Sequence, residues 1–397
     1  MSLYEKFAEY VAGDVTAIRA ITKLQPVGGP SSKVYAPTYK DGKNAAYATE
    51  TRWSEGQRVD SVLLDSIQSQ ANRMELALLN ACQDGRLNLP LFTLDVPGHG
   101  TLTALDVPHR VHDAIFRDSL WGGKPFRQSP EGHKLVAART ANATAFFNFC
   151  PTALLFGTWD SQSGGGANAA KVPRAIGSEI VGLDVVIGKR TASRIDPLGI
   201  KKDEGTIYKA ASNDEYWTLE EAKAEKDKFG KPMLFKKGKP SEINHGNIPP
   251  TIAPGGFTIR EALQTMVLSL TQLRRLRFPL DDGTDNPHRD AAGRAVLGAL
   301  GLYAFLLACE EGLDLRSRCH LVASHAPKFE VIRRVLGEPE TFSADSSMVK
   351  ELLDEALAAA KAQRLEWNGG PIKLTPTDKL LKLVKLSDQS AGTEDDG

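Results

Sequence analysis

The sequence predicts an α+β fold, and three observations carry this prediction. Residues 15–24 and 180–187 have the alternation and β-branched content of strands. Residues 291–311 and 347–364 have the apolar spacing of helices. Between these regions lies a polar, lysine-rich stretch, 189–250, that Pro and Gly interrupt repeatedly. A sheet with added helices and one long insertion accommodates all three.

Further elements are expected between these anchors. They are a short extended piece at 45–51, a helix from Val59 to Leu78, a buried strand at 146–159, a short helix at 218–226 and a helix at 260–277. The helix from Val59 to Leu78 is predicted because apolar residues recur there three and four positions apart. The helix at 260–277 is predicted to end before Pro279.

The expected domain organisation is a core with an excursion. Residues 1–187 and 251–386 form the predicted core, 188–250 the insertion, and 387–397 an acidic, disordered tail. The uncharged run 295–309 is shorter than the roughly 20 apolar residues of a membrane-spanning helix, so a buried helix is expected there. The first ten residues lack the features of a secretion signal, and a cytoplasmic location is expected.

Charge and cysteine content narrow the function classes. The 397 residues include 49 Lys and Arg and 49 Asp and Glu, so the whole chain lacks the basic excess of many nucleic-acid binders. Locally, residues 171–239 contain 15 basic and 11 acidic residues. The four cysteines are scattered and form no CxxC pair, which argues against a zinc ribbon and a disulfide framework.

Three blocks of the sequence resemble a known family. They are RWSEGQRVDSVLLDSIQSQANRME at 52–75, GGGANAAKVPRAIGSEIVGLDVV at 164–186 and KRTASRIDPLGI at 189–200. Together they resemble the RAMP-type backbone subunit of type I-G (formerly I-U) CRISPR effector complexes. The likeness extends from the first predicted strand to about Arg277 and is weakest in the insertion and the tail.

The resemblance implies a fold, a function and a set of partners. The fold is a modified RRM-like, ferredoxin-type (RAMP) core with a protruding thumb, and copies of the chain polymerise along the crRNA. Each copy holds the sugar-phosphate backbone, so that the spacer pairs with target DNA. Other effector subunits are implied as partners, including the large subunit and the crRNA-processing subunit, with a helicase-nuclease recruited to cut DNA. No catalysis, cofactor or membrane contact is expected.

Candidate RNA-binding residues lie first in the block at 52–75. Polar side chains and arginines there can donate hydrogen bonds to phosphates and 2′-hydroxyls: Arg52, Gln57, Arg58, Ser61, Gln68, Ser69, Asn72 and Arg73. Gln57, Arg58 and Ser61 stand where the family has an arginine-valine-serine-glutamine segment, but Asp60 departs from that pattern. The alternative is an ordinary solvated helix face.

A second group surrounds the glycine cluster 164–166. Glycines let a backbone approach a phosphate closely, which makes Gly165, Gly166, Lys171, Arg174 and Ser178 candidates for RNA binding. The GxxxxGK[ST] pattern is absent, so an ATP site is not supported. A mobile surface loop explains the glycines equally well.

The start of the insertion supplies a third group. Lys189, Arg190 and Arg194 are expected to contact RNA, and Ile195, Pro197 and Leu198 are candidates for an apolar wedge that displaces a base. A simple turn at Asp196 and Pro197 is the alternative.

Two other function classes compete with RNA binding. A metal-dependent nuclease or phosphoesterase is conceivable on Asp281, Asp282, Asp285, His288 and Asp290, because clustered carboxylates and a histidine can hold a divalent metal. Asp and Asn are also expected there as turn and N-cap residues. The second competitor is an assembly protein that binds only other proteins, for which a neutral net charge is natural.

Overall fold

Two compact units make up the chain. The computed structural model describes residues 2–42, 44–160, 171–212, 215–335, 337–338, 340–367 and 369–391. The larger unit comprises Met1–Val185 and Thr258–Val384, and the smaller comprises Val186–Phe257 and Lys385–Gly397.

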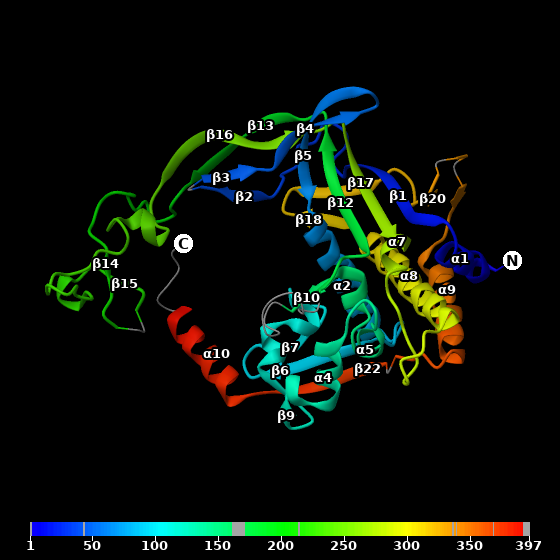
Figure 1. The fold of residues 1–397 in the computed structure, drawn as a ribbon. Coiled ribbons are helices and arrows are strands. Elements are labelled where there is room, and N and C mark those ends of the chain that lie inside the picture. The colour runs from blue at the N-terminus through cyan, green and yellow to red at the C-terminus, as the bar shows by residue number, and fades with distance from the viewer. Residues whose placement is uncertain are drawn as a thin grey trace. The chain divides into compact units, whose positions relative to one another are not determined.

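An antiparallel sheet organises the larger unit (Figure 1). Its strands follow the order β18-β19-β1-β17-β12-β5-β4, while β20 pairs with both β1 and β21. Their bounds are β1 Val15–Pro26, β4 Thr49–Ser54, β5 Gln57–Asp65, β12 Ile176–Leu183, β17 Glu261–Ser269, β18 Leu313–Arg316, β19 Cys319–Ala323, β20 Phe329–Arg333 and β21 Glu340–Phe342. The sheet curls strongly and brings β18 close to β5, although four strands lie between them in this order. Arg316 of β18 donates to the Leu64 carbonyl of β5 over 2.6 Å.

Helices cover one face of this sheet (Figure 1). They are α1 Leu3–Ala12, α2 Ile67–Gln83, α7 Leu270–Leu273, α8 Pro287–Glu310 and α9 Ser346–Ala362. The central helix, α8, is long and apolar enough to span a membrane, but 89% of its most apolar window is buried inside the protein. It is therefore a core helix, as the uncharged run 295–309 predicted.

A second sheet in the larger unit has the order β7-β6-β22-β8-β9. Its strands are β6 Pro90–Val96, β7 Gly100–Thr103, β8 Ser119–Trp121, β9 Lys124–Pro125 and β22 Gly370–Pro376. The ring of Phe92 packs edge-on against Trp121 at 5.1 Å, and Trp121 stacks on Phe126 at 5.7 Å. Parallel pairing of β22 with β6 joins a strand near the end of the chain to residues of its first third.

Short elements complete the larger unit. They are β2 Thr38–Asp41, β3 Asn44–Tyr47, α3 Ala114–Arg117, α4 Pro130–Ala137, α5 Thr144–Phe149, α6 Thr152–Phe156, β10 Thr158–Trp159 and β11 Lys171–Val172. The last helix, α10 Asp378–Ala391, continues past the boundary between the units.

The smaller unit is built on two long paired strands. β13 Val186–Arg194 pairs with β16 Ile248–Thr258, and the residues between them contain the short pair β14 Tyr208–Lys209 and β15 Trp217–Thr218. This distal part has a small core of its own, in which Ile207, Ala210, Ala224 and Phe235 are buried.

The structure confirms the α+β class and several predicted elements. The strand predicted at 15–24 is β1, and the helices predicted at 291–311 and 347–364 are α8 and α9. The extended piece at 45–51 is divided between β3 and β4. A modified RRM or ferredoxin-like core stays a prediction.

Other predicted elements are wrong. The helix predicted from Val59 begins only at Ile67, because Gln57–Asp65 is strand β5. The helix predicted at 260–277 is mostly strand β17, and the strand predicted at 146–159 is mostly the two short helices α5 and α6. The short helix predicted at 218–226 is reduced to a 3₁₀ turn at Glu221–Lys223. Of the tail predicted as disordered, residues 387–391 belong to α10, and residues 392–397 lie outside the described residues.

Candidate nucleic-acid interface

The hairpin of β4 and β5 carries the first group of predicted RNA contacts. Its turn, Glu55 and Gly56, has positive φ at both residues (50° and 78°), as two-residue hairpin turns of type I′ require. Gln57 and Arg58 follow this turn, and both are exposed. They lie on a strand rather than on the predicted helix, and their side chains are accessible to a ligand.

Two other residues of this hairpin already have protein partners. Arg52 donates to Glu179 over 2.8 Å and to Glu50 over 2.5 Å. The hydrogen bond to Glu179 is the main cause that raises the pKa of Arg52. Ser61 is 1% exposed, and its hydroxyl donates to the Glu50 carbonyl over 2.8 Å. Ser61 therefore holds the hairpin together and cannot reach RNA in this structure.

Helix α2 presents the rest of the first group on its first turns. Ser66 caps the helix by accepting from the Ser69 amide over 3.2 Å. Gln68 and Asn72 are exposed, whereas Ser69 is half-buried. Gln68 and Asn72 thus form a polar surface next to the positive end of the helix dipole.

The carboxylate of Asp65 gathers two arginines at the same place. Asp65 is fully buried and accepts from Arg73 over 2.9 Å, from Arg316 over 3.1 Å and from Gln70 over 2.7 Å. The two guanidinium groups are 28% and 26% exposed. One carboxylate balances two cations, so one positive charge is left over, and both arginines have N–H groups that these bonds do not use.

Arg316 is a functional candidate that the sequence analysis missed. It lies on β18, more than two hundred residues after Arg73 in the chain. The curl of the sheet brings the two together, since Arg316 also donates to the Leu64 carbonyl and Arg73 to the Leu315 carbonyl over 2.7 Å. Arg316 in the sequence RSRC gives no local signal of this neighbourhood.

Arg174 links β12 to the start of α2. It donates to the Ile67 carbonyl over 3.0 Å and to the Phe156 carbonyl over 3.2 Å. Burial is the main cause that lowers the pKa of Arg174, and the nearby Arg110 lowers it further. The structure therefore brings Arg174 together with Gln68 and Asn72 at one end of α2.

The other residues predicted around the glycine cluster do not join Arg174 at the end of α2. Ser178 is buried and donates to Gln70 over 2.9 Å, so its role is structural. Lys171 is exposed, with its ammonium 6.0 Å from the centre of the Trp159 ring. Gly165 and Gly166 lie outside the described residues.

The third group belongs to the smaller unit. Lys189 and Arg190 are exposed on β13, and Arg190 lies over Gly255, where an added Cβ would be 2.8 Å from its Cδ. Arg194 donates to the carbonyls of Gly246 and His245 over 3.0 and 2.8 Å. Arg194 therefore closes the base of the distal part.

The predicted wedge residues are exposed. Ile195 is 84% and Leu198 81% accessible, and Pro197 is exposed as well. Asp196 between them is buried and accepts from the amides of Leu198 and Gly246 over 2.9 and 2.8 Å. These hydrogen bonds lower the pKa of Asp196. Residues 195–198 thus form a turn and also present an exposed apolar surface. The predicted wedge and the alternative of a simple turn are therefore compatible.

Two of the aspartates proposed for a metal site have structural roles. Asp282 accepts from the Thr284 amide over 2.9 Å. Asp290 is buried between Arg277, at 2.7 Å, and Arg294, at 3.1 Å. Within the described ranges, no three His, Cys, Asp or Glu side chains come close enough to hold a metal ion, and Asp281, Asp285 and His288 belong to those ranges.

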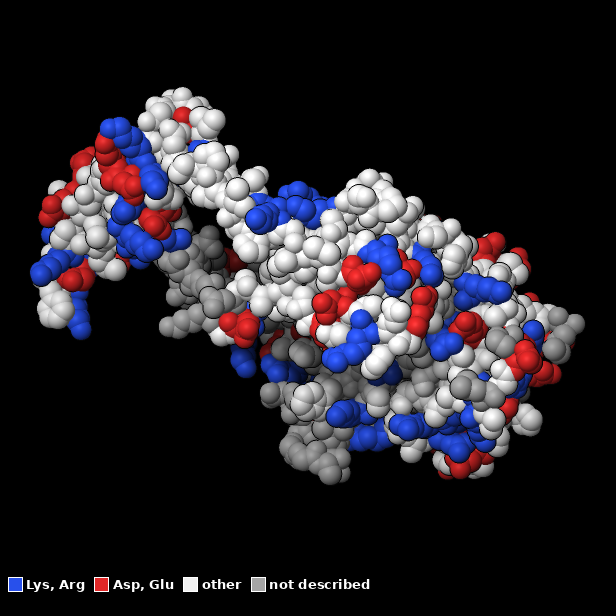
Figure 2. All heavy atoms as spheres, turned by 90° about the horizontal axis from the view of Figure 1, so that it is seen from above, with Lys and Arg blue, Asp and Glu red and all other residues white. Residues whose placement is uncertain are grey.

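Charge on the surface is mixed. Figure 2 shows Lys and Arg spheres among Asp and Glu spheres on the face in view, as the equal totals of 49 lead one to expect. The cations available to a polyanion are therefore local ones, such as Arg73 with Arg316.

Part of the chain matches a known protein family. Residues 18–187 match the family model described as CRISPR-associated protein GSU0053. The matched part runs from β1 to the start of β13 and includes the hairpin, α2 and Arg174. No curated protein matches the chain. The match supports a CRISPR-associated protein and a role in CRISPR defence.

Proposed function

We propose that the chain is a non-catalytic backbone subunit of a type I CRISPR effector complex and binds the phosphate backbone of the crRNA. The observation that carries this proposal is the pairing of Arg73 and Arg316 with the single carboxylate of Asp65. Of the two arginines, Arg73 lies on α2, inside the segment that matches a CRISPR-associated family, and Arg316 lies on β18 outside it. Phosphate is the ligand class that arginines in such a position recognise best.

The exposed polar groups support backbone recognition rather than base reading. Gln57, Arg58, Gln68 and Asn72 are exposed and can donate hydrogen bonds to phosphate oxygens and 2′-hydroxyls. A subunit that coats any spacer gains from contacts that ignore the base sequence, because the guide itself reads the target by pairing. The exposed Ile195 and Leu198 provide the apolar surface that an unstacked base would need.

The test is the affinity of single variants for two unrelated single-stranded RNAs of equal length. In Arg316→Gln, Arg73 still neutralises Asp65 and Gln70 still donates a hydrogen bond to it, so the fold is expected to survive. We expect the affinity for both RNAs to fall about tenfold, with a salt dependence reduced by about one phosphate contact. Arg73→Gln and Arg58→Gln are expected to behave alike.

The matched control is Arg86→Gln, which removes a surface arginine that pairs with its neighbour Asp84 over 2.9 Å. Its RNA affinity is expected to equal that of the native chain. Unchanged affinity in Arg316→Gln and Arg73→Gln, or a loss confined to one RNA sequence, would overturn the proposal. Metal-dependent cleavage of single-stranded nucleic acid that Asp282→Ala abolishes would decide for the nuclease instead.

A further inference from the structure

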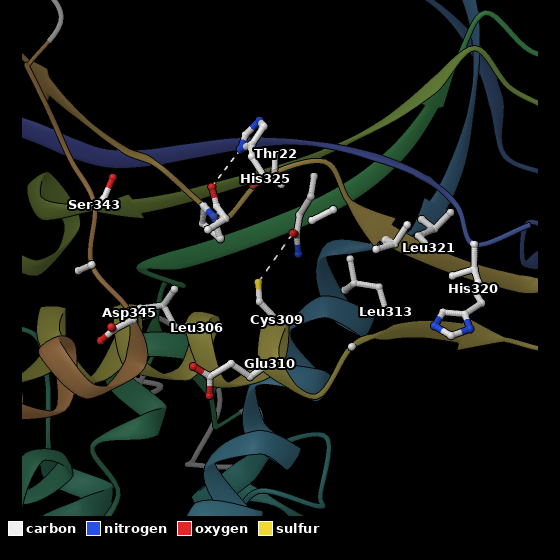
Figure 3. Close-up of a pocket in the computed structure, with 18 of the residues that line it drawn as sticks. Thr22, Leu306, Cys309, Glu310, Leu313, His320, Leu321, His325, Ser343 and Asp345 are labelled. Carbon is white, nitrogen blue, oxygen red and sulfur yellow. Dashed lines mark hydrogen bonds between the residues drawn. The ribbon is translucent and has the colours of Figure 1, made fainter. Parts of the chain in front are cut away.

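A pocket lies between the main sheet and the ends of two helices (Figure 3). It encloses about 790 Å³, a volume in the range of pockets that hold ligands. Its walls are mostly apolar and come from β1, β17, β18, β19, the end of α8 and the start of α9. Leu306, Leu313 and Leu321 are representative wall residues, and Glu310 and Asp345 are exposed carboxylates among the lining residues.

The pocket exists because β1 changes its partner. Residues 15–20 of β1 pair with β20, and residues 24–26 pair with β19. Between these two stretches β1 lacks a paired strand on that side, and a loop at 324–328 follows β19 instead. The opening between the strands is covered on the helix side by α8.

Polar groups at the floor of the pocket are not fully satisfied. Thr22 and Gln264 are opposite each other on β1 and β17, and they are 1% and 3% exposed. The Thr22 hydroxyl has no hydrogen-bond partner within the part of the chain that the structure describes.

The pocket is not equipped for covalent chemistry. Its cysteine, Cys309, faces the Gln264 amide at 3.9 Å, and burial raises the pKa of its thiol to about 12. A thiol that stays protonated is a poor nucleophile. A pocket with apolar walls and nearby carboxylates suits a ligand with apolar side chains and neighbouring positive charges.

Helix α10 of the same chain presents such a group. Its inner side, with Leu380, Leu381 and Val384, packs against the core. Its outer side carries Leu383 and Leu386, each 63% exposed, together with the exposed Lys379 and Lys382. Leucines three positions apart on one helix face are the anchors with which helices bind apolar grooves.

We infer that the pocket receives the outer face of α10 from a second copy of the chain. Leu383 and Leu386 would pack against the apolar wall, and Lys379 and Lys382 would meet Glu310 and Asp345. A contact between two different surfaces of one chain is heterologous, so it extends into a ring or an open filament. The inference deepens the proposed function, on which it rests for the expectation that copies assemble side by side.

A mixed disulfide experiment tests the contact without RNA. One batch of chain carries Leu383→Cys and another carries Met348→Cys, since Met348 lines the pocket and is 44% exposed. After mixing and mild oxidation, we expect a covalent dimer that neither batch forms alone. Lys385→Cys, on another side of α10, replaces Leu383→Cys as the control and is expected to give at least about tenfold less dimer.

Charge exchange provides an independent readout in solution. Glu310→Lys, or Lys379→Glu with Lys382→Glu, is expected to weaken self-association about tenfold or more, because like charges then face each other. Asp345 is left unchanged because it caps α9 by accepting from the Met348 amide over 2.8 Å. Mixing the two variants is expected to restore association, as sedimentation measures it. Failure of both the cross-link and the restoration would overturn the inference.

The two proposals fail separately. Binding of a short RNA to a single copy needs no contact between copies, so an RNA-binding chain that forms no cross-link contradicts only the α10 contact. A chain that cross-links at Leu383 but ignores RNA contradicts only the proposed function.

Discussion

At the scale of single residues, one buried ion pair holds three segments of the larger unit together. Arg110 is 7% exposed and donates to both oxygens of Glu75 over 2.7 and 2.8 Å. It also donates to the Gly157 carbonyl over 2.9 Å. Burial raises the pKa of Glu75 although Arg110 opposes this shift. Burial thus disfavours the charged form of the Glu75 carboxylate, and the ion pair with Arg110 offsets part of this cost.

We predict that Arg110→Met destabilises the protein by about 3 kcal/mol or more at pH 8, because it leaves a buried carboxylate unpaired. The pKa of Glu75 would rise further in this variant. As the pH falls, Glu75 would therefore be protonated in the folded state at a higher pH than in the unfolded state. The loss of stability is then smaller at pH 5 than at pH 8. Urea denaturation at the two pH values measures both effects.

The double variant Glu75→Gln with Arg110→Met serves as the control for this pH dependence. It removes the titrating group and is expected to recover part of the stability at pH 8. An Arg110→Met protein that is equally destabilised at both pH values would contradict the account.

Residue types alone did not separate exposed donors from buried ones. Ser61 and Ser178 were predicted as RNA contacts, yet both hydroxyls point to partners inside the protein. The reason is that β5 and β12 alternate their side chains between two faces, and the sequence does not tell which face is covered. Gln57 and Arg58 are exposed beside the hairpin turn, and Asn72 is exposed on helix α2.

At the scale of elements, α8 depends on glycine for its close packing. An added Cβ at Gly298 would lie 2.8 Å from Cζ of Phe7, which belongs to α1 and is 1% exposed. At Gly301 the nearest atoms would be Cδ1 of Leu268 at 3.3 Å and Cδ2 of Leu155 at 3.4 Å. The two positions share a helix and differ in the room that their neighbours leave.

We predict that Gly298→Ala destabilises the protein and that Gly301→Ala does not. Alanine gains about 1 kcal/mol over glycine in a helix interior. At Gly298 the clash with a core ring outweighs this gain, since overpacking costs about 1–3 kcal/mol. At Gly301 small shifts of two leucine methyls suffice. The free energies of unfolding of the two variants check this, and equal values would show that α1 adjusts to the added methyl group.

The errors in predicted elements have a physical cause as well. In β17 the side chains of Ala262, Gln264, Met266 and Leu268 are buried, which is the alternation of a strand. Gln264 interrupts the apolar alternation in the sequence because it is polar. It is buried nevertheless, and its amide donates to Gln70 over 2.9 Å. The true start of α2 was marked by Ser66, whose capping role a search for apolar spacing does not detect. By contrast, α8 and α9 are long and strongly apolar on the buried side, and they were predicted from sequence.

At the scale of the whole molecule, the neutral total charge and the local excess of cations are compatible. Ion pairs such as Arg52 with Glu179 and Arg277 with Asp290 use many of the arginines inside the larger unit. A polyanion would then be held at a few uncompensated positions rather than by a general field. Those positions depend on the curl of the sheet, which no single segment of the sequence encodes.

The distal part of the smaller unit closes on itself. Arg194 and Asp196 bind the backbone of His245 and Gly246, and the local core around Phe235 is separate from the core of the larger unit. The Thr251 hydroxyl donates to the Ala192 carbonyl over 3.2 Å, which shows that β13 and β16 run side by side near their outer ends. A two-residue turn can therefore connect them.

We predict that replacing residues 195–247 with Asn-Gly leaves the larger unit folded. Its melting temperature is expected to change by less than about 2–4 °C, which corresponds to about 1 kcal/mol for a unit of this size. The variant lacks Ile195, Pro197 and Leu198, so it also separates two proposed roles: the affinity of a single copy for short RNA is expected to persist, whereas displacement of a base from a longer guide is expected to be lost. Reactivity of the guide bases toward a chemical probe would measure that displacement. A variant that unfolds cooperatively at a much lower temperature would show that the two units stabilise each other.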